Sequence, residues 1–351
     1  MRQGEIDWQN VKRVLIVKLR SIGDTVLVTP ALIALKRSLP DAQIDILLED
    51  WVAPLLKGFD AVDNILTVGK SFAARSKAAR EIRKNKYDVV FNMHGGTTAT
   101  FFVRASGARH RVGYAGHQYS FLCNHLLSSA SDFWQKEITH SVEQQLALIG
   151  SVGIPVDDLP RTRLAVTAGS AASLAEKLQA IGFDAADSFA VIHPLAAFDS
   201  KRWAMENFAE VIEHLWGKGI KSIAVGAKNE IEALDELKAL CNVPFWISEK
   251  IDLPETTALL SKASLFVGND SGIAHMAAAM QVPTVVIFGS MNRDHWRPWT
   301  DAPNEVVFED LPCQPCAGYV CKEFGEPKCI LSVKPEAVIA AIDRVLSPAE
   351  S

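Results

Sequence analysis

A short polar turn in the second half of the chain has residue types that suit anion binding. Leu265 to Val267 is an apolar run of strand length, Gly268 to Ser271 is mostly polar, and an Ala-rich segment of helical propensity follows. A strand, a turn and a helix in this order place the free N–H groups of the helix at the carboxyl edge of a parallel sheet. We therefore expect an anion to bind there.

Three side chains of this turn are candidates for contact with that anion. Asp270 and Ser271 are also common helix caps, so their types alone do not require a ligand. Capping does not explain His275. It follows Ser271 by one helical turn, so it is expected on the same helix face, pointing towards the same crevice.

The stretch 268–289, GNDSGIAHMAAAMQVPTVVIFG, resembles the donor-binding signature of the ADP-heptose:lipopolysaccharide heptosyltransferases. These are inverting glycosyltransferases of the two-domain GT-B fold. The resemblance implies a nucleotide-sugar donor and an acceptor in the lipopolysaccharide inner core. It assigns the donor site to Lys201, Glu230, Asp270, Ser271, Gly272 and His275.

A second motif of this resemblance, Ser21-Ile22-Gly23-Asp24, follows the first apolar strand. In the family, the aspartate of the motif is the general base that removes a proton from the acceptor hydroxyl. From residue type alone, Asp24 could equally be a helix cap. The acceptor-binding residues that we infer are Ser21, Gly23, His94 and Arg104.

The loop from His193 to Trp203 resembles the segment in which the family places a diphosphate-binding lysine. Lys201 is the candidate, because Arg202 and Trp203 complete the match. Relatives usually have Gly and Ser where this chain has Leu195 and Ala197. This departure puts a close backbone approach and a hydroxyl contact at those two positions in doubt.

The strand end at Val225-Gly226 leads to Glu230, which resembles the acid that binds the nucleotide ribose in Rossmann-type sites. An acid in the first turn of a helix needs no ligand, so a purely structural role is the alternative.

Four cysteines crowd one Gly- and Pro-containing segment: Cys313, Cys316, Cys321 and Cys329. Four thiolates can bind zinc tetrahedrally, although these spacings are not those of a standard zinc finger. We expect a structural zinc, with free thiols as the alternative. Catalysis itself is expected to need no cofactor, because Lys201 and the helix dipole supply positive charge.

Strands and helices alternate along the chain at βαβ spacing, which predicts parallel sheets and an α/β fold. Strands are expected at 14–19, 43–48, 64–68, 88–93, 189–193, 221–225, 245–247, 265–267 and 284–288. The Pro- and Gly-containing stretch around 153–187 suggests a linker between domains.

The resemblance implies GT-B architecture, with two Rossmann-like lobes facing a central cleft. We expect an acceptor-binding lobe at 1–165, a linker at 166–187 and a nucleotide-sugar-binding lobe at 188–334. A C-terminal helix at 335–351 is expected to pack back on the first lobe.

The composition is that of a globular protein of two domains, with 48% hydrophobic residues and a net charge of -5. This charge gives no sign of nucleic-acid binding. No apolar run is long enough to span a membrane, so a cytoplasmic protein is expected. A basic helix around 75–86 is either solvated or in peripheral contact with phosphates of the acceptor or of the inner membrane.

The expected reaction is transfer of a heptose to a lipopolysaccharide-core acceptor with inversion. Two alternatives are a nucleotide-sugar epimerase of the same fold and a non-catalytic relative that keeps the sugar-nucleotide site. A nicotinamide oxidoreductase is disfavoured, because no G-x-G-x-x-G follows the first strand.

Overall fold

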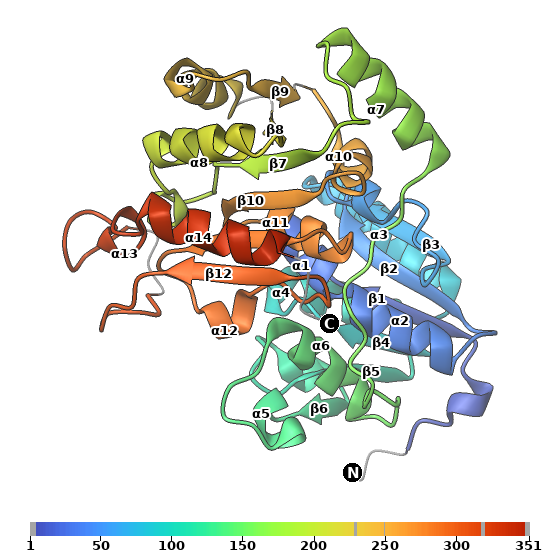
Figure 1. Cartoon of the computed structure of the whole chain (residues 1–351). Helices are drawn as coiled ribbons and strands as arrows, with labels where there is room; N and C mark the ends of the chain where they lie inside the picture. The colour runs from blue at the N-terminus through green and yellow to red at the C-terminus, as the bar shows by residue number, and fades with distance from the viewer. Residues whose placement is uncertain (1–4, 228–229, 249, 317–319, 348–351) are drawn as a thin grey trace. The chain divides into compact units, whose positions relative to one another are not determined.

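The computed structural model describes residues 5–227, 230–248, 250–316 and 320–347. The chain divides into two compact units, Met1–Ala165 and Val166–Ser351. Each unit is a parallel sheet with helices packed against it, as Figure 1 shows. Among the described residues, no helix is both long and apolar enough to cross a bilayer.

The sheet of the first unit has the strand order β3-β2-β1-β4-β5-β6. Its strands are β1 (Arg13–Val17), β2 (Gln43–Glu49), β3 (Asn64–Val68), β4 (Val89–Asn92), β5 (His110–Tyr114) and β6 (His125–Leu127). Its helices are η1 (Trp8–Asn10), α1 (Ile22–Leu27), α2 (Thr29–Ser38), η2 (Ala53–Leu56), α3 (Phe72–Asn85), α4 (Gly96–Ser106), η3 (Ser120–Leu122), α5 (Ala130–Trp134) and α6 (Ser141–Gly150).

The second unit repeats this topology with the order β12-β11-β10-β7-β8-β9. Its strands are β7 (Phe189–His193), β8 (Lys221–Val225), β9 (Trp246–Ser248), β10 (Leu265–Asn269), β11 (Thr284–Phe288) and β12 (Asn304–Phe308). Its helices are α7 (Ala168–Ala180), η4 (Asp199–Lys201), α8 (Met205–Gly217), α9 (Ile231–Leu240), α10 (Leu253–Leu260), α11 (Gly272–Ala279), α12 (Arg293–Trp296), α13 (Lys328–Leu331) and α14 (Pro335–Leu346).

Both strand orders are the 3-2-1-4-5-6 order of doubly wound folds, which bind ligands at the carboxyl ends of the two central strands. Those strands are β1 and β4 in the first unit and β7 and β10 in the second. The α/β fold with two Rossmann-like units is therefore confirmed. The prediction missed β5, β6 and β12, because these strands are only partly buried and carry His, Arg, Gly or Glu instead of an apolar run.

The break between α1 and α2 has its origin in Pro30. Proline has no N–H to donate to the Val26 carbonyl one turn earlier, so the helix cannot continue regularly. The Thr29 hydroxyl donates to that carbonyl instead, at 2.7 Å. The hydroxyl thus replaces the missing N–H as the donor to the buried Val26 carbonyl where the chain changes direction. As a result, α1 is a short helix at the end of β1.

Two segments of the expected domain plan contain helices that contact the second unit. The expected linker at 166–187 contains α7, a regular helix whose Lys177 forms an ion pair with Glu255 in the first turn of α10. The expected first-lobe helix at 335–351 contains α14, whose Val338, Ala341 and Ile342 lie in the hydrophobic core of the second unit. The apolar face of α14 is thus used within the second unit, and a contact with the first stays a prediction.

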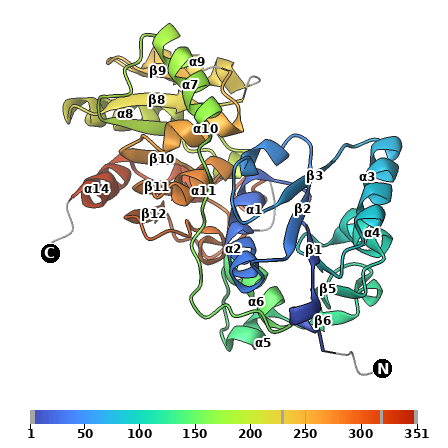
Figure 2. The same cartoon turned by 90° about the vertical axis from the view of Figure 1, so that its right-hand side faces the viewer.

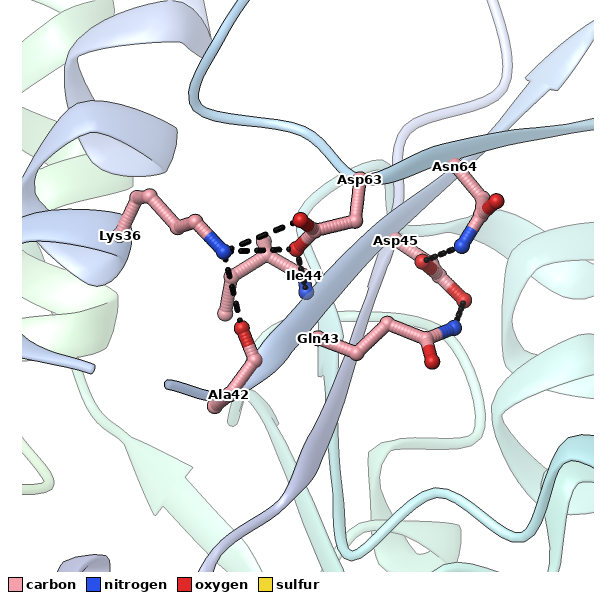
Figure 3. Close-up of polar contacts among 7 residues, drawn as sticks. All are labelled: Lys36, Ala42, Gln43, Ile44, Asp45, Asp63 and Asn64. Atoms are coloured by element: carbon pink, nitrogen blue, oxygen red, sulfur yellow. Dashed lines mark hydrogen bonds and ion pairs between the residues drawn. The ribbon is translucent and has the colours of Figure 1, made fainter. Parts of the chain in front are cut away.

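A polar cluster lies at the start of β2 and β3, the sheet edge opposite to the ligand-binding edge (Figure 3). The buried Asp45 carboxylate accepts from Asn64, Gln43 and the Tyr87 hydroxyl. Close by, Lys36 forms an ion pair with Asp63 at 2.9 Å. Every group of this cluster has a protein partner, so the cluster stabilises the pairing of β2 and β3.

Candidate functional site

The turn after β1 is built around Ser21, whose backbone has φ 65° and ψ 153°. Few residues other than glycine adopt this conformation, so the turn is strained. The Ser21 hydroxyl oxygen accepts from the Asp24 N–H at 3.2 Å and the hydroxyl donates to Asp24 Oδ2 at 2.6 Å. Ser21 thus caps α1 and at the same time orients the Asp24 carboxylate.

Lys18 is the second partner of Asp24. Its ammonium lies 2.8 Å from Asp24 Oδ1 and donates to the Met93 carbonyl at the end of β4, at 3.1 Å. The Lys18 side chain is 6% exposed and that of Asp24 is 30% exposed. The cation is therefore buried behind the carboxylate, and the carboxylate is the group that solvent or a substrate can reach.

The pKa of Asp24 follows from this geometry. Burial raises it, but the charge and hydrogen bond of Lys18, together with the Ser21 hydroxyl, outweigh burial and hold the pKa below its ordinary value. Asp24 is accordingly ionised at neutral pH. A carboxylate in this state can accept a proton, whereas a protonated one cannot.

Two histidines share the surroundings of this pair. Burial and the nearby charge of Lys18 lower the pKa of His94 to about 4. Burial, followed by the same charge, also lowers the pKa of His117. Both rings are therefore neutral at pH 7 and can donate or accept a hydrogen bond without adding charge.

Gly95 brings His117 close to the end of β4. Its N–H donates to Asn92 Oδ1 at 2.9 Å and its φ is 74°. A Cβ at this position would lie 3.0 Å from the His117 ring. The glycine is thus needed for the close approach of a side chain of the same unit.

The other residues predicted to bind the acceptor differ in position. Gly23 lies in the first turn of α1 beside Asp24. Arg104 lies in the last turn of α4, about 12 Å along the helix axis from Gly96 at its start. The structure therefore groups Gly23, Ser21, His94 and Asp24 around the end of β1 and places Arg104 away from them.

In the second unit, the predicted strand, turn and helix are present as β10, the residues around Asp270 and α11. Ser271 is the N-cap of α11, and its hydroxyl oxygen accepts from the Ala274 N–H at 3.4 Å. The hydroxyl also lies 3.1 Å from His193 Nδ1 at the end of β7. Gly272 begins the helix, so the first N–H groups of α11 lie at the carboxyl edge of the sheet.

Lys201 and Asp270 form an ion pair at this edge, with 2.7 Å between Lys201 Nζ and Asp270 Oδ2. The Asp270 side chain is 5% exposed and that of Lys201 is 15% exposed. Burial raises the pKa of Asp270 above its ordinary value, although the neighbouring Lys201 opposes this. Here the carboxylate is behind the ammonium, the reverse of the arrangement in the first unit.

Close packing fixes the loop that carries Lys201. A Cβ at Gly289 would lie 2.2 Å from the Ser200 carbonyl oxygen, so only glycine lets this loop lie against the end of β11. The buried Trp203 donates from its indole to the Val333 carbonyl at 2.8 Å. Leu195 is buried in the core of the unit, so the atypical residue at that position serves packing.

The two histidines of this edge are both buried. Burial lowers the pKa of His193 to about 4, which leaves it neutral at pH 7. His275 is 5% exposed within α11, so it is less accessible than the sequence suggested. Its predicted contact with the donor stays a prediction.

Glu230 lies at the start of α9, where its carboxylate accepts from the Ala227 N–H at 2.7 Å. This contact is the structural role that the sequence left as an alternative, and one carboxylate can make it while binding a ribose hydroxyl. The two residues before Glu230, Lys228 and Asn229, lie outside the described residues. Its ribose contact stays a prediction.

The cysteine segment is held to the second unit by ordinary hydrogen bonds. Cys316 N–H donates to the Ser290 carbonyl at 2.8 Å, and the Gln314 amide donates to the Gly289 carbonyl at 2.6 Å. Within the described part of the chain, which includes all four cysteines of the segment, no group of three or more His, Cys, Asp or Glu residues could hold a metal ion. The structural zinc expected for these four cysteines stays a prediction, with free thiols as its alternative.

Sequence reasoning missed three residues of these edges: Lys18, His117 and His193. Lys18 had a usable signal, because a lysine inside the apolar run from Val14 to Leu19 needs a buried partner. His117 had none. His193 is the last residue of the strand predicted at 189–193, but nothing in the local sequence shows that it faces Ser271.

Comparisons with known proteins identify the family of this chain. Residues 75–325 match the model of glycosyltransferase family 9 (heptosyltransferase). A lipopolysaccharide heptosyltransferase 3 of Escherichia coli is 29% identical over 93% of this chain and 97% of its own.

Two solved structures share the fold. A family 9 glycosyl transferase from Veillonella parvula has a TM-score of 0.82 at 19% identity, covering 95% of this chain and 97% of its own. The ADP-heptose lps heptosyltransferase II of E. coli has a TM-score of 0.79 at 21% identity, covering 95% and 98%.

Proposed function

We propose that this chain, which belongs to glycosyltransferase family 9 (heptosyltransferase) and is a glycosyltransferase, transfers a heptose from ADP-heptose to an acceptor in the lipopolysaccharide inner core. The names of the relatives support this donor and this acceptor. The observation that carries the proposal is that each unit has one Lys–Asp ion pair and that the more exposed partner differs between the two units. The first unit exposes an ionised carboxylate, and the second exposes an ammonium beside a helix N-terminus.

In the first unit, Asp24 acts as the general base. Its carboxylate takes the proton from the acceptor hydroxyl while that oxygen forms a bond to the anomeric carbon of the heptose. Lys18 and Ser21 keep the carboxylate ionised and oriented. Attack from the face opposite to the leaving group inverts the anomeric configuration.

In the second unit, Lys201 and the first N–H groups of α11 stabilise the departing diphosphate. The bond between the anomeric carbon and the diphosphate oxygen breaks, and ADP leaves with the electron pair. A cation and a helix N-terminus are the elements that stabilise such charge in phosphate sites. We assign the ribose contact to Glu230. We propose that no cofactor is needed for these steps.

Membership in a glycosyltransferase family favours this function over a nucleotide-sugar epimerase or a non-catalytic binding protein. Asp24 and Lys201 also give separate groups for the acceptor and the donor, which an epimerase without an acceptor does not need.

The test is to incubate the purified chain with ADP-heptose, UDP-glucose or GDP-mannose and to measure nucleoside diphosphate release with and without deacylated inner-core acceptor. We expect ADP release only from ADP-heptose and only with acceptor. Release that is independent of acceptor, or a preference for another nucleotide sugar, would contradict the proposal. Acceptors that end in Kdo or in heptose would then identify the core position.

A further inference from the structure

One surface of the first unit combines exposed aromatic side chains with arginines, and we call it the aromatic–basic face. It spans α3, α4 and η3, of which α3 and α4 pack side by side (Figure 2) and η3 contacts α4. Its aromatic members are Phe72, Phe101, Tyr119 and Phe121, and its basic members are Arg75, Arg80, Arg83 and Arg104.

The aromatic members are far more exposed than aromatic residues usually are. Phe72 is 87% exposed and Phe121 75%, while Phe101 and Tyr119 are each about half exposed. Among the described residues, Phe324 is the one exposed phenylalanine outside this face. Single exposed apolar residues are ordinary, but several from neighbouring elements indicate an interaction surface.

Local structure holds these side chains outside the core. Tyr119 has φ 59°, a left-handed conformation that a bulky residue rarely adopts. The Thr100 hydroxyl of α4 donates to the Gln118 carbonyl at 3.1 Å and ties this turn to the helix. Tyr119 and Phe121 then pack edge to face, with ring centroids 6.2 Å apart. The exposure thus belongs to an ordered turn.

The arginines belong to the same surface as the aromatic residues. The Arg83 guanidinium of α3 lies against Gly107 at the end of α4, where an added Cβ would be 1.1 Å from Arg83 Nη1. Arg104 is exposed on α4, one turn from Phe101. Cationic and aromatic groups are therefore both present on each of the two helices.

Charge is strongly segregated in this part of the sequence. Residues 64–131 contain ten Lys and Arg but only two acids, Glu81 and Asp88, a surplus of eight positive charges. The whole chain has a net charge of -5, so the rest of it carries thirteen more acids than bases. A generally solvated surface would not require this separation, whereas a surface that meets an anionic partner would.

We propose that the aromatic–basic face docks on a lipid bilayer that contains anionic headgroups. Aromatic rings insert at the boundary between headgroups and acyl chains, and arginines pair with lipid phosphates. Four rings and four arginines on adjacent elements supply both contributions at once. This inference does not depend on the donor or acceptor proposed above.

The test is co-sedimentation of the full chain with vesicles of phosphatidylcholine alone or with about one third phosphatidylglycerol, at low and high salt. We expect binding to the anionic vesicles that weakens with salt, and little binding to the neutral ones. Absence of binding to anionic vesicles would overturn the proposal.

Two variants separate the contributions. Arg75→Gln/Arg80→Gln/Arg83→Gln should weaken binding by up to about one hundred-fold, since each cation near an anionic membrane contributes roughly a five-fold factor. Phe72→Ser/Phe121→Ser should weaken binding to a similar degree and leave the salt dependence unchanged, because the charged contacts remain. A matched control, Lys238→Gln/Leu240→Ser on exposed positions of α9, should bind like the wild type.

A different partner of the aromatic–basic face would give different results. If the phenylalanine variant became monomeric from a dimer while vesicle binding stayed intact, the face would be a contact between two copies of this chain, and the proposal would be wrong. Equal loss in the control would also contradict it. Transfer to a deacylated acceptor in solution should be unchanged in all three variants, so this measurement distinguishes failure of membrane docking from failure of the proposed reaction.

Discussion

Each unit has a Lys–Asp pair at the carboxyl edge of its sheet, but the partner that is buried differs. Lys18 and Lys201 both follow the first strand of their sheet. In the first unit Asp24 is the more exposed partner and its pKa is lowered; in the second Lys201 is the more exposed partner and the pKa of the buried Asp270 is raised. The comparison teaches that one fold can offer either a base or a cation, depending on which partner is buried.

The cluster around Asp45 shows what such groups look like without a ligand-binding role. It lies at the amino ends of the strands, and Asp45 receives hydrogen bonds from three different side chains. Asp24 and Asp270, in contrast, lie at the carboxyl edges and depend on few partners. The carboxylates that can still accept hydrogen bonds are thus those at the carboxyl edges, where doubly wound folds bind ligands.

The largest effect is expected for Asp24→Asn, which keeps the shape of the side chain and removes the base. Turnover should fall by a factor of about 10² to 10⁴, while ADP-heptose affinity stays nearly unchanged. The measurements are kcat from ADP release and donor Kd by calorimetry. The matched variant Asp270→Asn should instead change the ADP Kd, because it alters the partner of Lys201. If Asp24→Asn abolished donor binding, Asp24 would be a structural cap and not the base.

Lys201→Ala tests the cation of the second unit. ADP binding should weaken about ten- to one-hundred-fold, the range for a charge-assisted hydrogen bond, and adenosine binding should change little. Calorimetric titration with both ligands measures this. Lys238→Ala, an exposed lysine on α9, is the control and should leave both affinities unchanged. A similar loss for adenosine and ADP would remove Lys201 from the phosphate site.

Lys18→Met tests whether the buried cation keeps Asp24 ionised. Since the base must be ionised, activity is lost as the pH falls through the pKa of Asp24. Lys18 lowers that pKa and burial raises it, so removing Lys18 should move the acid limb of the kcat/KM profile to higher pH, above the ordinary value of 3.8. Lys36→Met, which breaks the Lys36–Asp63 pair, is the control. An acid limb that did not move would show that Lys18 does not influence the pKa of the base.

Part of this arrangement could be read from the sequence. The apolar runs at 14–19 and 265–267, with polar turns after them, predicted the carboxyl ends of two central strands, because the strand period and turn chemistry are local properties. The partners of Asp24 and Asp270 could not be read in the same way. Which ammonium faces which carboxylate depends on strand order, and β7 and β10 are separated by more than seventy residues.

The smallest effect concerns the strained turn at Ser21. Ser21→Ala removes the cap and the hydrogen bond to Asp24 but keeps a Cβ at φ 65°, so it should cost about 0.5 to 2 kcal/mol of stability. Ser21→Gly removes the same hydroxyl but also relieves the backbone strain, which is worth about 1 to 3 kcal/mol, so its stability should equal or exceed that of the wild type. This order is the reverse of that at an ordinary helical position, where Gly is the more destabilising of the two. Urea unfolding of both variants measures it, and both should lose activity to a similar degree because both lose the hydroxyl that orients the base. If Ser21→Gly were less stable than Ser21→Ala, the turn would not be strained and the cap alone would account for Ser21.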